Sequence, residues 1–498
     1  MASCSSEPQN GPGTVNFLIE SMPANLDPRV GTDAQSERID SLLFSGLLER
    51  DPQMNLRGDL AERWESPDPL TYVFHLRSGV RFHDGRPLTS ADVKFTFDSI
   101  RTGEIQTLKR ATFRMVRAID APDPQTVVFH LREPFSSFLW NVARPAVGIV
   151  PAGSRADFAG HPIGSGPFRF VRALQDEEVV LERNPDYFRT APIIEKVRFR
   201  IVPDAVVRAL ELRKGTGDLE SSSLPADMVA VLRKDPALSV TEDSGTEYAY
   251  VAINFDDPAL ARREVRQALA FATDRDTIIR YLLRGQARFA DSLLPPNSWA
   301  YEPNVAHYPY DPARAEQLLD AAGFPRRPEL GGMRLHLVLK TSTEESTRLL
   351  GAALQEQWRR VGVDLELRSL ELATLLSDVN RGNFQLYTLQ WVGGNNDPDM
   401  FEYVFSSRRM PPDGANRGHY RNARVDALLD QARVEPDQEK RRQLFAEVQR
   451  IVAEDLPYLS LWYTDNICVH RRRVENIALL PGGDYGFLSG ITLRTDQP

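Results

Sequence analysis

The chain has 498 residues, of which 42% are hydrophobic and 26% are charged, and its formal net charge is −9 at pH 7. This length is too great for a single hydrophobic core, so we expect two or three domains. The acidic balance disfavours a nucleic-acid partner, because phosphate binding requires a clustered excess of lysine and arginine. No stretch of the sequence approaches the roughly 18 to 20 continuous apolar residues that a membrane-spanning helix needs.

The N-terminal residues 1–13 are small, polar and rich in proline and glycine, which predicts a flexible tether. Ala2-Ser3-Cys4 resembles the end of a bacterial lipoprotein signal, and two interpretations of it stay open. In one, Cys4 carries a lipid that attaches the protein to a membrane. In the other, Cys4 is an ordinary residue of the tail. We do not expect Cys4 to form a disulfide with Cys468, the other cysteine of the chain.

The region after the tether predicts the first elements of a folded domain. A short apolar strand is predicted at 15–19, and the loop SMPANLDPR follows it. The helical spacing of apolar residues predicts a helix over 34–48.

Residues 60–100 carry the most ordered pattern of the sequence. Alternation predicts a strand over 71–77, and residues 80–82 continue the same period in a returning strand. Thr89 and Asp92 then fit the capping box of a helix. This stretch therefore predicts a hairpin followed by a helix.

A second turn and strand, PDPQTVVFHLR at 122–132, repeats the pattern of PDPLTYVFHLR at 67–77. We interpret the two as paired strands of one subdomain. Further on, alternation predicts a strand over 197–201, followed by a helix from Asp204 to a stop at Gly215. A strand, a helix and a return indicate α/β character with a mixed sheet.

The second half of the chain continues this succession of strands and helices. Residues 248–255 predict a buried strand, and Asp311 and Gly323 are typical of the N-cap and the end of a helix. The strand, helix and strand predicted over 335–367 favour a parallel pair joined by a right-handed crossover. A final apolar strand is predicted near 457–469.

The phrase GVRFHDGRPLTSADVKFTF, with Trp64 and the strand TYVFHLR before it, closely resembles the signature of family 5 extracytoplasmic solute-binding proteins. These proteins are the dipeptide, oligopeptide and nickel-binding receptors of ABC importers. The turn Gly164–Phe168 and the helix DPARAEQLLDAAGF resemble further parts of the family pattern. The resemblance implies an α/β, two-lobed periplasmic-binding-protein fold of class C (type II-like), with an extra subdomain inserted in lobe I.

The resemblance also implies a division of the chain, in which two strands join the lobes and the first hinge lies near 254–258. The expected parts are a flexible tether at 1–13, lobe I (Ia) at 14–52, 164–258 and 470–498, the inserted subdomain (Ib) at 53–163, and lobe II at 259–469.

Residues 390–399 (QWVGGNNDPD) are the best candidate for a ligand-binding loop. Trp391 offers a flat face for stacking, the glycines let backbone N–H groups approach a solute, and asparagine side chains suit peptide amides. The alternative is a structural turn whose Trp391 packs in the interior. The resemblance favours the ligand-binding interpretation, since this stretch is similar to the cleft loop of lobe II. The candidate ligand-binding residues are Met22, Asn25, Tyr248, Tyr250, Asn254, Arg348, Trp391, Gly393, Gly394, Asn395, Asn396 and Asp397.

Gly394 departs from the family pattern. Many peptide-binding members have an aspartate three residues after the tryptophan, where it pairs with the α-ammonium of the ligand. Its loss would leave a desolvated ammonium unpaired, at a cost of roughly 2–5 kcal/mol. Asp397 either substitutes for it or holds the loop by capping, and Arg348 either meets a ligand carboxylate or is a surface charge of a helix.

Enzyme motifs are missing from the sequence. It contains no His-Glu-x-x-His, no Gly-Lys-Ser/Thr phosphate loop and no Gly-x-Ser-x-Gly elbow, and two cysteines cannot form a zinc cluster. His75, His83 and His130 lie in strand contexts that favour structural roles over metal ligation. We therefore expect neither an enzyme nor a cofactor nor a bound metal.

The resemblance implies a monomeric extracytoplasmic receptor, periplasmic or at the cell surface. It would capture a small peptide-like molecule between its lobes and deliver it to an ABC transporter permease. A nickel-chelate or oligosaccharide receptor of the same family, and a non-transport peptide-binding or chaperone-like module, stay open as alternatives.

Overall fold

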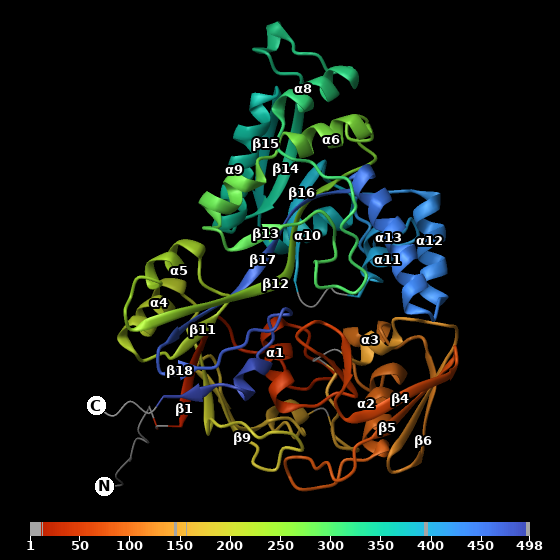
Figure 1. Cartoon of the computed structure of the whole chain (residues 1–498), viewed down its shortest axis with the longest axis vertical. Coiled ribbons are helices and arrows are strands. Elements are labelled where there is room, and N and C mark those ends of the chain that lie inside the picture. The colour runs from red at the N-terminus through yellow and green to blue at the C-terminus, as the bar shows by residue number, and fades with distance from the viewer. Residues whose placement is uncertain (1–10, 12, 144–146, 156, 393–396, 495–498) are drawn as a thin grey trace. The chain divides into compact units, whose positions relative to one another are not determined.

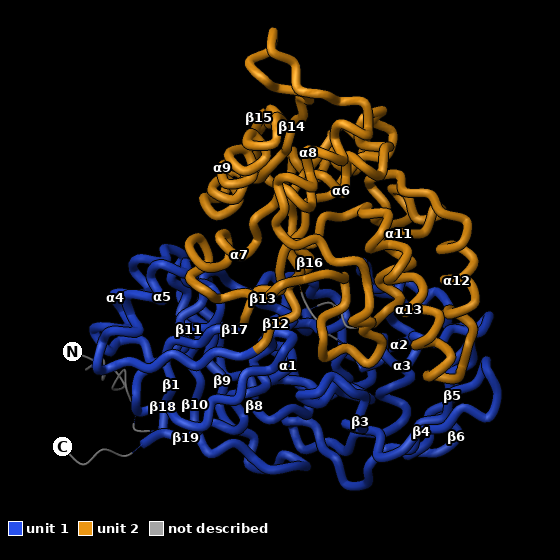
Figure 2. Tube along the Cα trace, turned by 45° about the horizontal axis from the view of Figure 1, so that its top comes forward, with its two compact units in different colours: residues 1–243, 466–498 blue, residues 244–465 orange. Residues whose placement is uncertain are grey.

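The computed structural model describes residues 11, 13–143, 147–155, 157–392 and 397–494. The chain divides into two compact units, residues 1–243 with 466–498 (unit 1) and residues 244–465 (unit 2) (Figure 2). Each unit combines helices with β-sheet, as the α/β prediction requires. Among the helices of the described residues, none combines the length and the apolar character that a membrane crossing requires.

The chain passes between the units twice, in β12 (Leu238–Ile253) and in β17 (Tyr458–Arg471). Both units thus contain part of each strand, and both divisions come earlier in the chain than the predicted lobe boundaries after 258 and 469. The subdomain predicted at 53–163 lies within unit 1 and is not separated from the rest of that unit. The bounds of the subdomain therefore stay a prediction.

The main sheet of unit 1 is mixed, as predicted. It has the strand order β17-β11-β1-β10-β9-β8, in which β1 is parallel to β10 and β11 while β9 runs antiparallel to its neighbours. These strands are β1 (Thr14–Ile19), β8 (Phe168–Leu174), β9 (Glu178–Arg183), β10 (Lys196–Ile201) and β11 (Leu219–Ser221).

Alternation along β1 builds two cores, one on each face of this sheet. Val15, Phe17 and Ile19 pack into a core shared with α1 (Ala34–Leu43). Leu18 points to the opposite core, which contains residues of α4 (Ala205–Lys214) and α5 (Ala226–Leu232). The helix predicted over 34–48 is shorter in the structure and ends at Leu43. The backbone is extended at Phe44, and the chain then enters β2 (Leu48–Arg50).

Four antiparallel strands form a second sheet in unit 1, in the order β4-β5-β7-β6. They are β4 (Ala61–Asp68), β5 (Thr71–Leu76), β6 (Val116–Asp123) and β7 (Thr126–Leu131), and α2 (Ser90–Thr102) packs on them (Figure 1). The two similar strand sequences, β5 and β7, pair directly, which confirms the subdomain pairing predicted from their repeat.

The hairpin predicted from residues 71–82 is wrong in its second strand. Residues 80–82 form only an isolated bridge between Arg81 and Pro87, and β5 pairs with β4 and β7 instead. The apolar period at Val80 and Phe82 reflects burial in the core beneath α2 rather than a strand. The helix start is as predicted, since the backbone N–H of Thr89 donates to Asp92 over 2.8 Å. Unit 1 also contains β3 (Leu56–Gly58), α3 (Phe138–Val142), β18 (Val474–Glu475) and β19 (Thr492–Leu493).

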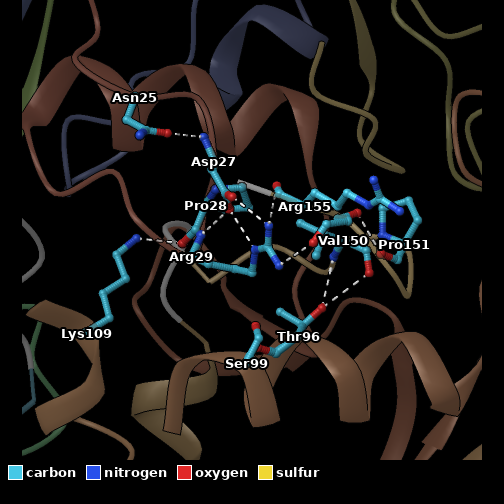
Figure 3. A network of polar contacts seen from close by, with 11 residues as sticks. Asn25, Asp27, Pro28, Arg29, Thr96, Ser99, Lys109, Val150, Pro151 and Arg155 are labelled. Atoms are coloured by element: carbon cyan, nitrogen blue, oxygen red, sulfur yellow. Dashed lines mark hydrogen bonds and ion pairs between the residues drawn. The ribbon is translucent and has the colours of Figure 1, made fainter. Parts of the chain in front are cut away.

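A buried ion pair holds the loop that follows β1 (Figure 3). The Arg29 side chain is fully buried and donates from Nε and Nη2 to the two carboxylate oxygens of Asp27, over 2.9 and 2.7 Å. Its Nη1 also donates to the Ser154 carbonyl oxygen over 3.2 Å, and the guanidinium carbon lies 5.6 Å from the centre of the Phe158 ring. This loop is thereby joined to a segment more than a hundred residues later in the chain.

A buried carboxyl in unit 1 makes stability depend on pH. Glu220 of β11 accepts hydrogen bonds from the backbone N–H and the hydroxyl of Ser223, the first over 2.7 Å. Burial raises the pKa of Glu220 from 4.5 to about 7. Between these values the folded protein holds more protons than the unfolded chain, so this carboxyl lowers the free energy of unfolding as pH rises.

Glu220→Gln is expected to raise the midpoint of thermal unfolding at pH 8 by roughly 2–4 °C, because the amide keeps an acceptor for Ser223 without the buried charge. Calorimetric scans from pH 5 to pH 8 should show a flatter dependence than in the parent protein. Glu182→Gln, at an exposed position of β9, is the control and should change neither quantity. If Glu220→Gln were less stable than the parent protein by the same amount at pH 5 and at pH 8, the effect of Glu220 would come from its shape rather than its charge.

Unit 2 is built on a sheet with the order β15-β14-β16-β12-β17. Its strands include β13 (Ala287–Phe289), which pairs with β17, and β14 (Leu335–Ser342), β15 (Val363–Leu370) and β16 (Leu386–Trp391). The strands β14 and β15 are parallel and are joined by α9 (Glu345–Arg360), which confirms the predicted parallel pair.

Two cores lie on the two faces of this sheet. One contains residues of α6 (Arg263–Phe271), α8 (Pro312–Ala321) and α9, including the fully buried Trp358. The N-cap predicted for α8 is confirmed, because the Asp311 side chain accepts from the Arg314 N–H over 2.9 Å. The other core contains residues of α10 (Leu372–Asn380), α11 (Met400–Phe405), α12 (Ala423–Val434) and α13 (Gln438–Asp455), the last two side by side (Figure 1). Unit 2 also contains the short helix α7 (Arg275–Thr277).

Candidate functional site

Trp391 is the last residue of β16, where it lies opposite Tyr248 of β12. Its ring is half-buried against the core of unit 2 and lies parallel to the Tyr250 ring, with 6.2 Å between ring centres and 16° between planes. Its Nε1 atom is buried and has no hydrogen-bond partner. The structure thus combines the two interpretations of Trp391, because one part of the ring packs inside while another part reaches the surface.

A stack of tyrosines supports the Trp391 ring. Tyr250 lies against Tyr458 with 4.0 Å between ring centres, and against Tyr248 with 5.7 Å. The Tyr248 hydroxyl is 2.6 Å from the Ser460 hydroxyl. Burial raises the pKa of Tyr250 and Tyr458 well above the ordinary value, so both hydroxyls are neutral. Tyr248 and Tyr250 are almost fully buried, and their contact with a ligand stays a prediction.

Arg417 is a residue of this site that the sequence analysis missed. Its guanidinium carbon lies 5.8 Å from the centre of the Trp391 ring, and its Nε donates to Asn380 Oδ1 over 2.8 Å. Burial lowers the pKa of Arg417, but three neighbouring tyrosines raise that pKa by a larger amount: Tyr387, Tyr250 and Tyr458. The guanidinium therefore stays charged. No spacing in the sequence connects Arg417 with Trp391, because only the fold brings the two together.

Asn254 and Asp397 hold local backbone. The Asn254 amide nitrogen donates to the carbonyl oxygens of Phe384 and Gly382 over 2.7 and 3.3 Å, and its oxygen accepts from the Asp256 N–H. Asp397 Oδ1 accepts from the N–H of Asp399 over 3.0 Å, just before α11, as the capping alternative expects. A role for either side chain in ligand binding stays a prediction.

The remaining candidates divide between described and undescribed residues. Arg348 is exposed on α9, as the surface-charge alternative expects. In unit 1, Met22 is partly buried against the core, and Asn25 accepts from the Asp27 N–H over 2.8 Å (Figure 3). Four loop residues and the tether cysteine lie outside the described residues: Gly393, Gly394, Asn395, Asn396 and Cys4.

The three histidines considered in the sequence analysis, His75, His83 and His130, have local partners. His83 is partly buried and lies between the Gly166 carbonyl oxygen, 3.1 Å from Nε2, and the Gly164 N–H, 3.2 Å from Nδ1. Loss of solvation lowers its pKa to about 4. His75 and His130 each lie beside a carboxylate on the subdomain surface. Within the described part of the chain, no group of three or more histidine, cysteine, aspartate or glutamate residues is placed to hold a metal ion.

Comparison with known proteins decides the family. The model described as bacterial extracellular solute-binding proteins, family 5 middle, matches residues 55–410, which is more than half of the chain. The chain belongs to this family. The resemblance drawn from residues 60–100 is confirmed, since the matched range contains that stretch. Family 5 solute-binding proteins work outside the cytoplasm, and the relatives found here are binding proteins rather than enzymes.

Among the family 5 relatives is the di/tripeptide-binding protein 1 of Pseudomonas aeruginosa, which is 29% identical over 96% of this chain and 94% of its own length. The structure of HbpA2 from Haemophilus parasuis is 26% identical in sequence and has a TM-score of 0.85. The match covers 97% of this chain and 100% of the HbpA2 chain. NikZ from Campylobacter jejuni, in complex with Ni(L-His), is 26% identical with a TM-score of 0.79, over 96% and 98% of the two chains. These similarities confirm the two-lobed family 5 fold.

Proposed function

We propose that this protein is the extracytoplasmic receptor of an ABC importer, and that it captures a peptide-like solute and delivers it to the transporter permease. The observation that carries the proposal is the similarity to a di/tripeptide-binding protein over nearly the whole length of both chains. Family membership over residues 55–410 supports the same class of function.

The site in unit 2 supports a peptide-like solute. The half-exposed Trp391 ring is held by a stack of buried tyrosines, so its position is fixed before a ligand arrives. A rigid aromatic face binds apolar and amide groups at a low cost in side-chain entropy. Such a surface accepts many side chains, which suits a receptor for peptides of varied sequence.

A nickel-chelate receptor is the second candidate, because the similar NikZ structure contains Ni(L-His). A chelated metal brings its own ligands, so this candidate does not require a cluster of metal-binding side chains. The peptide receptor and the nickel-chelate receptor differ only in the solute that they bind, so one binding screen distinguishes them.

A thermal-shift screen tests the proposed function. Di-, tri- and pentapeptides and the nickel complex of histidine are each added at millimolar concentration. A ligand at about 100 times its dissociation constant stabilises the folded protein by about 2.7 kcal/mol, so even weak binding raises the unfolding midpoint. We expect the peptides to raise it. A rise with nickel–histidine alone would favour the second candidate, and no rise with any peptide would contradict the first.

We also propose that Cys4 carries a lipid and that the receptor acts as a monomer. The sequence Ala2-Ser3-Cys4, which resembles the end of a bacterial lipoprotein signal and precedes polar residues, supports lipid attachment. Mass spectrometry of the protein extracted from membranes of a host that processes lipoproteins should show an acyl-modified N-terminal peptide. Replacing Cys4 with serine should release the protein from those membranes, and an unmodified peptide would contradict the proposal.

A further inference from the structure

Arg417 differs from two other arginines of unit 2 that lie against aromatic rings, Arg441 and Arg266. Arg441 lies 5.4 Å from the centre of the Trp299 ring, and its Nη2 donates to Asp399 over 3.0 Å. Arg266 lies 4.2 Å from a phenylalanine ring and donates to backbone carbonyl oxygens, over 2.6 to 2.9 Å. The hydrogen bond that Arg417 Nε donates goes to the uncharged amide of Asn380. Within the described part of the chain, no carboxylate lies within ion-pair distance of it.

The surroundings of Arg417 leave its charge without compensation. The groups that act on it are tyrosines, and burial keeps the hydroxyls of Tyr250 and Tyr458 neutral. A partly buried guanidinium that lacks an anion attracts one more strongly than an exposed guanidinium does, because less water screens the charge. The site therefore favours a negatively charged group over an ammonium group.

An unused hydrogen-bond donor lies beside Arg417. Trp391 Nε1 is buried without a hydrogen-bond partner. Buried polar atoms in folded proteins nearly always have partners, and those that lack one often belong to a ligand site. This atom belongs to the ring over which Arg417 lies, with 5.8 Å between the guanidinium carbon and the ring centre.

We propose that Arg417 binds a carboxylate of the captured solute beside the Trp391 ring. The inference rests on the proposed function and adds a chemical class to it, namely solutes with a free carboxylate. A guanidinium presents parallel N–H groups that match the two oxygens of a carboxylate, which a lysine cannot do. In a peptide this carboxylate is either the C-terminus or an acidic side chain. Amidation of the C-terminus removes the first and leaves the second, so it distinguishes the two sources.

The test uses three probes in isothermal titration: Ala-Ala-Ala, Ala-Ala-Ala-amide, and Ala-Ala-Glu-amide. For the parent protein we expect Ala-Ala-Ala to bind more tightly than its amide. Arg417→Gln should weaken binding of Ala-Ala-Ala by roughly 10- to 100-fold, as expected for loss of a hydrogen-bonded charge partner, and should leave binding of the neutral amide unchanged. Arg417→Lys should restore part of the difference. Recovery of binding by Ala-Ala-Glu-amide would identify a side-chain carboxylate as an equivalent source.

Arg421→Gln is the matched control, because it removes the same charge from an exposed arginine four residues away. It should leave all three affinities unchanged. The unfolding midpoint of the unliganded Arg417→Gln protein should match that of the parent, which excludes a folding defect.

Two outcomes would overturn the inference alone. One is unchanged binding of Ala-Ala-Ala by Arg417→Gln. The other is an equal loss for the acid and for the amide, which would show that Arg417 only supports the Trp391 ring. If the parent protein bound none of the three probes, the proposed peptide function and the inference would fail together.

Discussion

Arg29→Ala is expected to lower the free energy of unfolding by about 3–5 kcal/mol, because it leaves the buried Asp27 carboxylate without its charge partner. Both side chains of this pair are almost completely inaccessible to water. The carbonyl oxygens of Ser154 and Arg155, to which the guanidinium donates, would lose a donor as well. Urea denaturation followed by circular dichroism measures the change.

Arg86→Ala is the matched control for Arg29→Ala. Arg86 also pairs with a carboxylate two residues away, Asp84, over 2.6 Å, but about half of its side chain is exposed. An exposed pair contributes at most about 1 kcal/mol, so this variant should unfold nearly as the parent does. If both variants lost the same stability, burial of the Asp27–Arg29 pair would not be the cause.

Trp391→Ala is expected to weaken binding of a peptide ligand by about 1–3 kcal/mol, through loss of apolar area and of the aromatic face. The ring is the half-exposed end of a stack whose other members are buried, so it is the part of the stack that a solute can reach. Calorimetric titration with a peptide identified in the screen measures the effect.

Trp391→Phe is the conservative control for Trp391→Ala. It keeps an aromatic face, so most of the affinity for the peptide should remain. The unfolding midpoint without ligand shows whether truncation has disturbed the tyrosine stack. Unchanged affinity in Trp391→Ala would remove this residue from the binding site.

Local patterns in the sequence predicted the elements that depend on local interactions. Alternation predicted β5, and a side-chain cap predicted the start of α8, because each signal lies within a few residues of the element it describes. The first half of β12 was missed. Its sequence, LSVTEDSG, is largely polar, and it is a strand only because of its neighbours in the sheet.

The candidate site shows the same limit. Trp391 was predicted from its own loop, whereas Arg417 reaches it from a distant segment that carries no motif. The loop after β1 contains two candidate ligand-binding residues, Met22 and Asn25, and nothing in its sequence indicated that its charged side chains are buried, because such side chains are seldom buried. Asp27 and Arg29 are buried because each neutralises the other, and Asn25 holds the backbone between them and α1.

Cys468 provides a natural reporter of the opening of unit 1. It lies in β17 opposite Ser221 of β11, is fully buried, and has a thiol whose pKa is raised by burial. A thiol in this state reacts only when the surrounding strands separate. The rate at which an alkylating reagent labels Cys468, read by peptide mapping, therefore measures how often β11 and β17 part in the native protein.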